Sequence, residues 1–156
     1  MKDIKNKYDQ FRKKYSLPKL EELTKEFAVK LESPDLILHD IVDKIKEEIL
    51  DKAKTLESII FIGSSDEPSI LYEANMLKGK REKIFAFYKK LMSIVWNGRK
   101  VETSANEEDM VKFIKETHND WTKNLKKEFI EICKIFENKW KDASLREATT
   151  EMMYHG

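Results

Sequence analysis

The chain has 156 residues, a length that suits one compact domain. Hydrophobic residues make up 40% of it and charged residues 38%, so the composition excludes a disordered chain and leaves enough apolar mass for a core. Four glycines and three prolines are too few for a turn-rich β-sandwich, and the single cysteine, Cys133, excludes an intramolecular disulfide and a cysteine-based zinc site.

The net charge of +1 conceals two oppositely charged segments. Residues 31–77 carry 4 basic and 11 acidic side chains, a net charge of −7, whereas residues 78–100 carry 8 basic side chains against Glu82 alone, a net charge of +7. These segments either neutralise each other within the fold or leave the basic one to face an anionic partner. The sequence does not decide between these alternatives.

Residues 1–30 predict an N-terminal helical appendage of two short helices. The first has an apolar stripe spaced by 4, 3 and 4 residues, which consists of Ile4, Tyr8, Phe11 and Tyr15. Residues 16–18 end this helix, and Pro18 suits an early position of the second, which runs to about Phe27. We expect an extended connection from there to the main helical bundle, residues 31–156.

The next segment predicts the longest helix of the chain. Ser33, Pro34 and Asp35 form a strong helix start, because the hydroxyl can cap, proline suits the first position and an acid favours the helix dipole. The apolar stripe that follows consists of Leu38, Ile41, Val42, Ile45, Ile49, Ala53, Leu56 and Ile60. Gly63 is the expected stop.

Two further helices are predicted before residue 100. Residues 66–68 start the first, and Gly79 separates it from the second. The second helix runs from about Lys80 to Trp96 and ends at the turn-forming pair Asn97-Gly98. Its apolar residues cover an unusually wide arc, so this helix either lies at the centre of the bundle or contacts a partner.

The last third of the chain predicts two more helices. Ser104 and Glu107 match a capping box and start the first. The pair Asn119-Asp120 separates it from a last long helix, whose stripe consists of Trp121, Leu125, Phe129, Ile132, Phe136 and Trp140. The expected fold is an all-α, single-domain helical bundle of about six helices joined by short capped loops.

No metal-binding pattern stands out. Asp35, His39 and Asp43 can share one helix face, but the Glu-x-x-His pairs of carboxylate-bridged iron bundles are absent from the sequence. The same spacing recurs in residues 147–155, near a terminus where we do not expect a preformed site. The sequence therefore predicts no metal and no cofactor.

Catalysis is not indicated either. His118 lies beside two acids and is better explained by a helix cap or a surface ion pair, and Cys133 is expected to be a buried, inert thiol. The four glycines are too far apart for a phosphate-binding loop, and no nucleophile motif occurs. The sequence favours a protein that is not an enzyme and gives no catalytic residues.

The wide apolar arc at residues 80–96 predicts a contact surface. A helix that is apolar over most of its circumference buries that surface in its own bundle or against another chain, and interface cores are rich in aromatic residues and methionine. The predicted anchors for a protein partner, or for self-association, are Phe85, Phe87, Tyr88, Met92 and Trp96. We expect a non-catalytic interaction protein: an adaptor, an assembly subunit or a regulator.

The alternative is an RNA- or single-stranded-DNA-associated protein that uses the basic segments 1–20 and 78–100. The basic residues of the second segment are Lys78, Lys80, Arg81, Lys83, Lys89, Lys90, Arg99 and Lys100. Aromatic residues lie among them, as in proteins that stack bases and neutralise phosphates. Against this interpretation, lysine predominates where bidentate recognition prefers arginine, and the acidic segment upstream is an available partner.

The N-terminus has no apolar region of the kind found in signal peptides. The longest aliphatic and aromatic run, residues 59–62, is far shorter than a membrane span. We therefore expect a cytoplasmic protein that makes no membrane contact.

Overall fold

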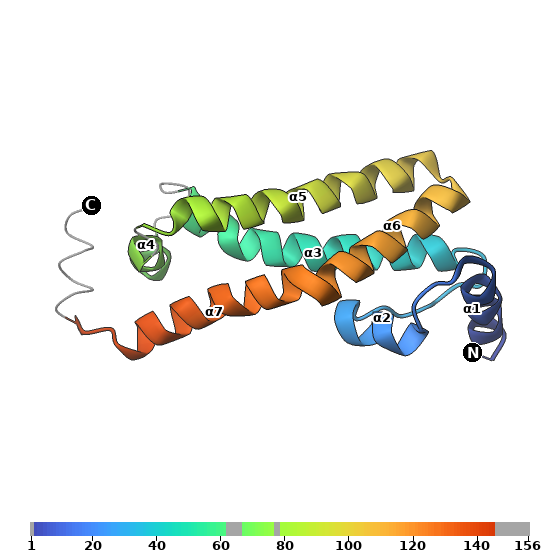
Figure 1. Ribbon diagram of the computed structural model, residues 1–156, viewed down its shortest axis with the longest axis horizontal. Helices are drawn as coiled ribbons and strands as arrows, with labels where there is room; N and C mark the ends of the chain where they lie inside the picture. Colours follow the sequence, from blue (N-terminus) through green and yellow to red (C-terminus); the bar gives the residue numbers. More distant parts are fainter. Residues whose placement is uncertain (1, 62–66, 77–78, 146–156) are drawn as a thin grey trace.

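The computed structural model describes residues 2–61, 67–76 and 79–145, and these residues confirm the predicted all-α fold. They contain helices and no strand. The elements, in chain order, are α1 (Lys2–Tyr15), α2 (Leu20–Phe27), α3 (Ile37–Ile60), α4 (Pro68–Met76), α5 (Arg81–Ser104), α6 (Glu107–Asp120), the π-helical segment η1 (Trp121–Leu125) and α7 (Lys126–Lys141) (Figure 1).

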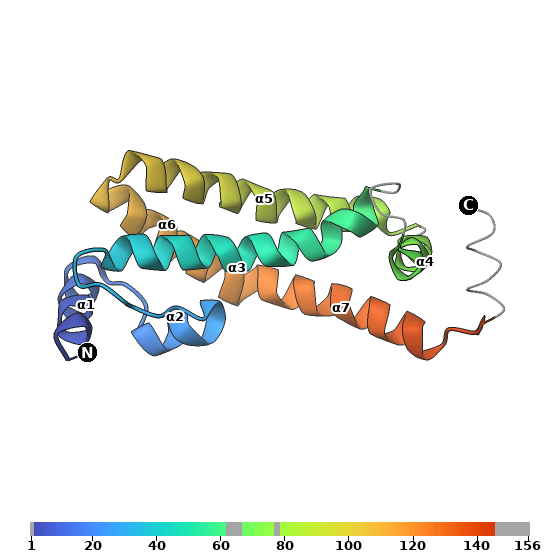
Figure 2. The ribbon, with the colours of Figure 1, turned by 180° about the vertical axis from the view of Figure 1, so that it is seen from behind.

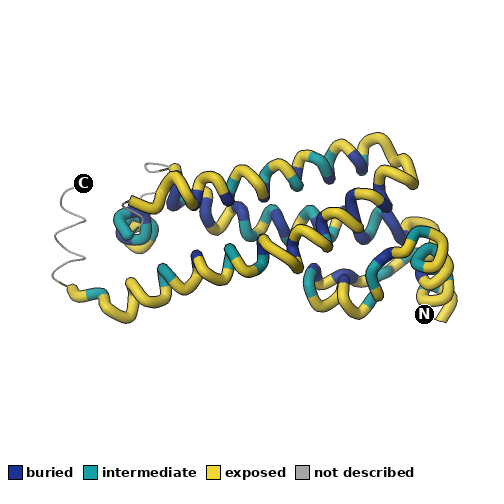
Figure 3. Tube along the Cα trace, in the orientation of Figure 1, coloured by how far each residue is buried: buried dark blue, intermediate teal, exposed yellow. Residues whose placement is uncertain are grey.

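The antiparallel pair α3 and α5 forms the centre of the molecule. The two helices lie side by side in both views, and α6 packs against both of them (Figures 1 and 2). The helices α1 and α2 lie near the start of α3, and α4 lies near its end (Figure 1). The largest fully buried side chains of the central pair are Ile37, Ile41, Ile45, Ile49, Leu56, Ile84 and Leu91. Burial alternates along α3 and α5 in step with the helical turn (Figure 3).

The predicted stripe of α3 is buried throughout, from Leu38 to Ile60. The helix begins at Ile37 rather than at Pro34, because the residues before it form a turn in which the Leu36 N–H donates to the carbonyl of Ser33 (3.3 Å). The expected stop, Gly63, and the following helix start at Asp66 lie outside the described residues.

The predicted end of α5 at Asn97-Gly98 is wrong, and the helix continues to Ser104. Gly98 is buried inside the helix, where a Cβ would lie 3.1 Å from Cζ of Phe113 and 3.4 Å from Cβ of Lys46. Glycine is therefore needed at this position for the close approach of α3 and α6, and it does not mark a turn.

The cap of α6 is Asn106 rather than Ser104. The side-chain oxygen of Asn106 accepts a hydrogen bond from the backbone N–H of Asp109 (3.0 Å), as an N-cap does. Ser104 is the last residue of α5, and Ala105, in the left-handed conformation with φ of 52°, turns the chain between the two helices.

The helices α6 and α7 are continuous through η1, so the predicted break at Asn119-Asp120 is also wrong (Figure 1). In η1 the backbone pairs five residues apart, and the N–H of Lys126 donates to the carbonyl of Trp121. Thr117, Trp121 and Leu125 are all buried, so packing continues past the point where the local turn preference favours a break.

Residues 1–30 contribute to the same hydrophobic core as the central helices, through Tyr8, Leu17, Leu23, Phe27 and Val29. The hydroxyl of Tyr8 donates to the carbonyl of Pro18 (2.5 Å) and fixes the turn between α1 and α2. The division into an appendage, residues 1–30, and a main bundle, residues 31–156, stays a prediction.

Candidate functional site

One antiparallel register aligns α3 with α5. The contacts that fix it, from one end of the pair to the other, are Phe61 with Phe85, Glu57 with Tyr88, and Lys46 with Glu102. The stretch of α3 from Leu50 to Lys54 therefore lies opposite the stretch of α5 from Met92 to Trp96. Side chains on this flank of the pair form a single surface.

Four of the five predicted anchors share that flank with Phe61. The rings of Phe85 and Tyr88 are stacked with centroids 6.2 Å apart, and Phe61 packs edge-on to both, at 6.3 and 5.8 Å. Met92 and Trp96 continue the row along α5 at four-residue spacing. We call the set Phe61, Phe85, Tyr88, Met92 and Trp96 the aromatic face.

The aromatic face is largely open to solvent. Trp96 is 61% exposed, Phe61 45% and Phe85 39%, whereas Tyr88 and Met92 are half-buried against the core. The guanidinium of Arg99 lies 4.4 Å from the centroid of the Trp96 ring, in a cation–π contact. Single exposed apolar residues are ordinary on a protein surface, but a row of large aromatic residues is not.

Phe87, the fifth predicted anchor, belongs to the core and not to this surface. It is 2% exposed, and its ring stacks on Phe129 of α7 at 6.3 Å. Phe87 lies on the turn of α5 between Ile84 and Leu91, both buried, and so faces the interior. The wide apolar arc predicted for this helix is in fact two adjacent stripes, one buried and one exposed.

Polar contacts hold the aromatic face in place. The hydroxyl of Tyr88 donates to Oε2 of Glu57 (3.1 Å), so that α3 fixes the ring. Burial raises the pKa of Tyr88, and the neighbouring carboxylate of Glu57 raises it further. Tyr88 therefore stays a neutral hydrogen-bond donor at physiological pH.

An ion network closes the other end of the α3/α5 pair. Nζ of Lys46 lies 2.6 Å from Oε2 of Glu102 and 3.0 Å from Oδ1 of Asp43. Burial opposes the charge on Lys46, but the two carboxylates outweigh burial and raise its pKa. The pair joins a base of the acidic segment, residues 31–77, to Glu102, an acid that follows the basic segment, residues 78–100.

The acidic and basic segments are neighbours in space, yet they do not neutralise each other through direct contacts of these helices. Apart from Lys46–Glu102, the ion pairs of α3 among the described residues lie within the helix, and they are Lys44–Glu47, Lys44–Glu48, Lys46–Asp43 and Lys52–Glu48. In the described part of the chain, no ion pair joins an acid of α3 to a base of α5. The surface of the α3/α5 helix pair therefore carries both acidic and basic side chains.

The basic residues of segment 78–100 point to several sides of α5. Three are engaged within the fold: Arg81 donates to the carbonyl of Ile60, Lys90 pairs with Glu128, and Arg99 covers Trp96. Lys80, Lys83, Lys89 and Lys100 are exposed. Helical spacing places Lys83 on the flank toward α7, with Lys90. Lys89 lines a groove against η1 and α7, and Lys100 lines a groove against α6. Lys78 lies outside the described residues.

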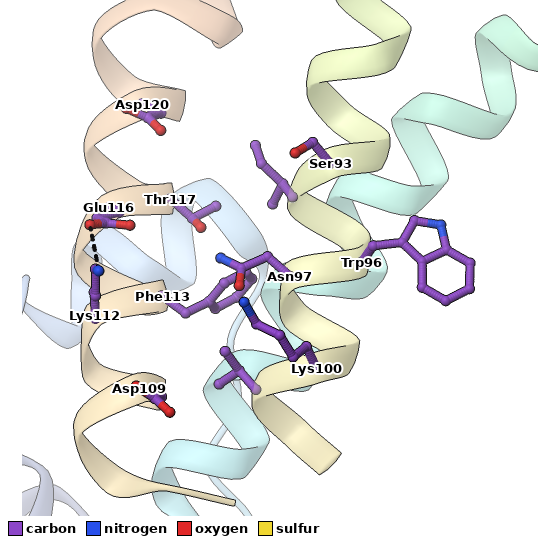
Figure 4. Close-up of a pocket in the computed structure, with 12 residues that line it drawn as sticks. Ser93, Trp96, Asn97, Lys100, Asp109, Lys112, Phe113, Glu116, Thr117 and Asp120 are labelled. Carbon is purple, nitrogen blue, oxygen red and sulfur yellow. Dashed lines mark ion pairs between the residues drawn. The ribbon is translucent and has the colours of Figure 1, made fainter. Parts of the chain in front are cut away.

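A polar groove of about 710 Å³ lies on the opposite flank of α5, against α6. Asn97 points into it toward α6, whereas Trp96 points away, as Figure 4 shows. Across the groove, Lys112 pairs with Glu116 on α6 at 4.0 Å (Figure 4). The lining carries both charges on an open surface, with no convergent set of unpaired groups that defines a ligand.

The residues considered for metal binding or catalysis do not form a common site in the described part of the chain. In the described ranges, no three His, Cys, Asp or Glu side chains gather where they could hold a metal ion. His39 and His118 are half-buried on separate helices, α3 and α6. Cys133 is exposed, contrary to the prediction, because it lies beside rather than on the buried line of α7 marked by Ile132. Residues 147–155 lie outside the described residues.

The core stripe of α3 does not include Phe61 and Glu57, so the sequence analysis does not identify them as site residues. A signal existed: Leu50, Glu57 and Phe61 recur at spacings of 7 and 4, on a second flank beside the core stripe. What the sequence could not supply was the register that sets this flank beside Tyr88.

Comparison with protein-family models, with curated proteins and with solved structures found no match in any of the three. A search of the described helices for a segment of the length and apolarity that a bilayer crossing requires also found none.

Proposed function

We propose that this protein is a non-catalytic helical interaction protein that binds a protein partner through the aromatic face. The observation that supports this most is the exposure of Trp96, at 61%, in line with Phe85 and Phe61. Full burial of an aromatic side chain covers about 150–250 Å², and burial contributes about 25 cal/mol per Å². These three rings are 39–61% exposed, so a partner can cover that fraction of each. Three such rings on one flank form an interface core of the usual composition.

The rigidity of the surface supports the same proposal. Tyr88 is held by Glu57, Phe61 packs on both neighbouring rings, and Arg99 holds the indole of Trp96. Side chains that are already ordered lose little conformational entropy on association. A partner would meet a preformed surface rather than a flexible one.

The nucleic-acid interpretation has less support from the geometry. Binding to phosphates requires several cations on one side, and α5 distributes its cations over at least two flanks. Arg81 and Lys90 are also engaged by the carbonyl of Ile60 and the carboxylate of Glu128. The aromatic rings stack on each other instead of standing apart as base platforms.

Site-specific photo-crosslinking tests the proposal. A benzophenone amino acid is placed at position 96, and irradiation of cells of the source organism should yield an adduct that mass spectrometry maps to this position. The control carries the same probe in place of Lys127, which is exposed on α7, and should yield no such adduct. Thermal unfolding of both variants checks that they fold. An absence of adducts at position 96, or identical adducts at both positions, contradicts a partner on the aromatic face.

A further inference from the structure

We propose that the groove between α5 and the continuous helix α6–η1–α7 binds an α-helix of a partner protein. That partner helix carries acidic side chains along one edge and basic side chains along the other. The groove lies on the flank of α5 opposite to the direction in which Trp96 points (Figure 4). It is a second binding surface, so this inference goes beyond the proposed function and does not rest on it.

The groove extends along most of α5. The polar groove of about 710 Å³ against α6 shares Ser93, Ile94 and Asp120 with a groove of about 650 Å³ against η1 and α7, so the two are continuous. The lining residues of α5 extend from Ala86 to Val101, a distance of about 22 Å along the helix axis. A partner helix of about four turns has the same length.

The two walls of the groove carry opposite charges that do not meet each other. Lys89 and Lys100 line the wall formed by α5, and Asp109 and Asp120 line the wall formed by the other helix; all four are exposed. In residues 2–61, 67–76 and 79–145, none of these four side chains forms an ion pair. We call them the corner charges.

The other charged residues of the lining already have partners. Lys90 pairs with Glu128 across the groove at 3.2 Å, and Lys112 pairs with Glu116 within α6 at 4.0 Å. The unpaired charge on the α5 wall is therefore positive, and the unpaired charge on the opposite wall is negative. A partner has to satisfy both walls at once.

The corner charges form two level pairs. The two lysines are eleven residues apart, and so are the two aspartates, about three helical turns in each case. Because Gly98 lies against Phe113 and the two helices are antiparallel, each lysine is nearly level with one aspartate (Figure 1). Each end of the groove thus presents one base and one acid on opposite walls, about 16 Å from the pair at the other end.

This arrangement favours a helix as the occupant. A small ion cannot reach both walls, and a polyanion such as a nucleic acid is repelled by the aspartates. A helix is about 10–12 Å wide with its side chains, and residues eleven apart return to the same edge, so it can meet both ends of both walls. Ser93, Asn97 and Thr117, between the corners, have short side chains that leave room for it.

Selection from a phage-displayed library of helical peptides tests the site. The peptides are alanine-rich and about 18 residues long, which is five turns, and each exposed position is varied among glutamate, lysine, leucine and alanine. Peptides that bind the purified chain should carry two glutamates eleven residues apart on one edge and two lysines eleven residues apart on the other. Binders without this pattern, or no binders at all, overturn the inference.

Two variants distinguish the groove from the aromatic face. Ser93→Trp fills the junction of the two grooves and should abolish binding of the selected peptides. Phe85→Ser alters the aromatic face and should leave binding within about threefold of the original. Circular dichroism of both variants checks that they fold. The reverse result overturns the groove as the site, whereas the proposed function, which concerns the aromatic face, is then unaffected.

A charge exchange between chain and peptide tests the contacts at one corner. Lys100→Glu should weaken binding of a selected peptide by about tenfold, because two acids then face each other. A peptide with lysine in place of the facing glutamate should bind this variant within about threefold of the original affinity. Lys134→Glu, exposed on α7 outside the groove, changes the net charge equally and should leave binding unchanged. Equal losses for both variants, or no recovery with the exchanged peptide, contradict the proposed contacts.

Discussion

Trp121 donates its indole N–H to the carboxylate of Glu26 at 3.0 Å and so joins two residues 95 positions apart in the chain. The other oxygen of the same carboxylate accepts from Nζ of Lys126, also at 3.0 Å. The ring of Trp121 is buried against Phe27 and lies under the ammonium group of Lys52, at 5.1 Å from its centroid. The π-helical segment is thus the place where α2, α3 and α7 are held together.

Glu26→Gln should lower the free energy of unfolding at pH 7 by about 1–3 kcal/mol, because a charged acceptor of two hydrogen bonds is lost. Burial opposes ionisation of Glu26, but the bonds from Lys126 and Trp121 outweigh it and lower its pKa. The stabilisation is therefore present above pH 4.5 and is lost as the pH falls through the lower value in the folded state. Urea unfolding from pH 7 to pH 3 measures this. Glu21→Gln, exposed on the same helix, is the control, and an equal loss for both contradicts the assignment.

Tyr8→Phe should destabilise the protein by about 1–2 kcal/mol at pH 7, because the carbonyl of Pro18 loses its partner. Burial raises the pKa of Tyr8 well above the usual value of 10.0. In the unfolded chain this hydroxyl ionises near pH 10, so its stabilisation is full below that pH and is lost as the pH rises further. Alkaline unfolding should be shallower for Tyr8→Phe than for the original chain. An alkaline loss of stability that is equally steep in Tyr8→Phe contradicts the assignment.

Gly98→Ala should destabilise the protein by about 1 kcal/mol, although alanine is the better helix former by a similar amount. The added methyl group would lie 3.1 Å from Phe113, which is fully buried, and 3.4 Å from Lys46, which is tied to Glu102. Denaturant unfolding measures the change. Ser93→Ala, at an exposed position of the same helix, should be neutral or slightly stabilising. A gain in stability at position 98 would show that α3 and α6 can move apart without cost.

Phe87→Ala and Trp96→Ala should differ in their effect on stability, because Phe87 lies in the core and Trp96 on the surface of α5. Phe87→Ala leaves a cavity beside Phe129 and should cost about 3–5 kcal/mol of stability. Trp96→Ala should change the free energy of unfolding by less than about 0.5 kcal/mol. Denaturant unfolding of each variant makes the comparison. Equal destabilisation by the two substitutions would place Trp96 in the core.

The chain should bind single-stranded RNA weakly and with a shallow salt dependence, because the cations of α5 do not share one side. Fluorescence anisotropy with labelled RNA at low and high salt checks this. A surface that neutralises about six phosphates loses on the order of a thousandfold in affinity between roughly 50 and 200 mM salt. Tight binding with that steep dependence would restore the nucleic-acid interpretation and identify the basic segment as its footprint.

The all-α fold follows from the apolar spacing, which was strong enough to predict most helices and the buried stripe of α3. The predicted helix ends were wrong at residues that favour a turn locally but lie within a helix in the fold. Gly98 and Asn119 favour turns locally, but close packing on Phe113 in one case and continuous burial past Trp121 in the other overrode that preference. Ser104 and Asn106 are both good caps, and local sequence does not rank them.

The candidate site was predicted only in part for a different reason. The spacing identified Phe85, Tyr88, Met92 and Trp96 but could not distinguish them from Phe87, because periodicity within one helix does not show where the neighbouring helix lies. Only the packing of α3 on α5 divides the wide apolar arc into a buried stripe and an exposed one. Residues from the other helix, such as Phe61, enter the site through that same packing.

The π-helical segment η1 also determines where one residue can be deleted from this helix without a change in its buried side. A π-turn holds one residue more than the α-turn it replaces, and in η1 the N–H of Lys126 accordingly donates to the carbonyl of Trp121, five residues back. Removal of one exposed residue between Trp121 and Leu125 would convert η1 to an ordinary α-turn and leave Ile132 facing the core. A deletion elsewhere in α6 or α7 would instead rotate everything that follows by about 100°. The continuous helix formed by α6, η1 and α7 thus contains one extra residue, which lies in η1.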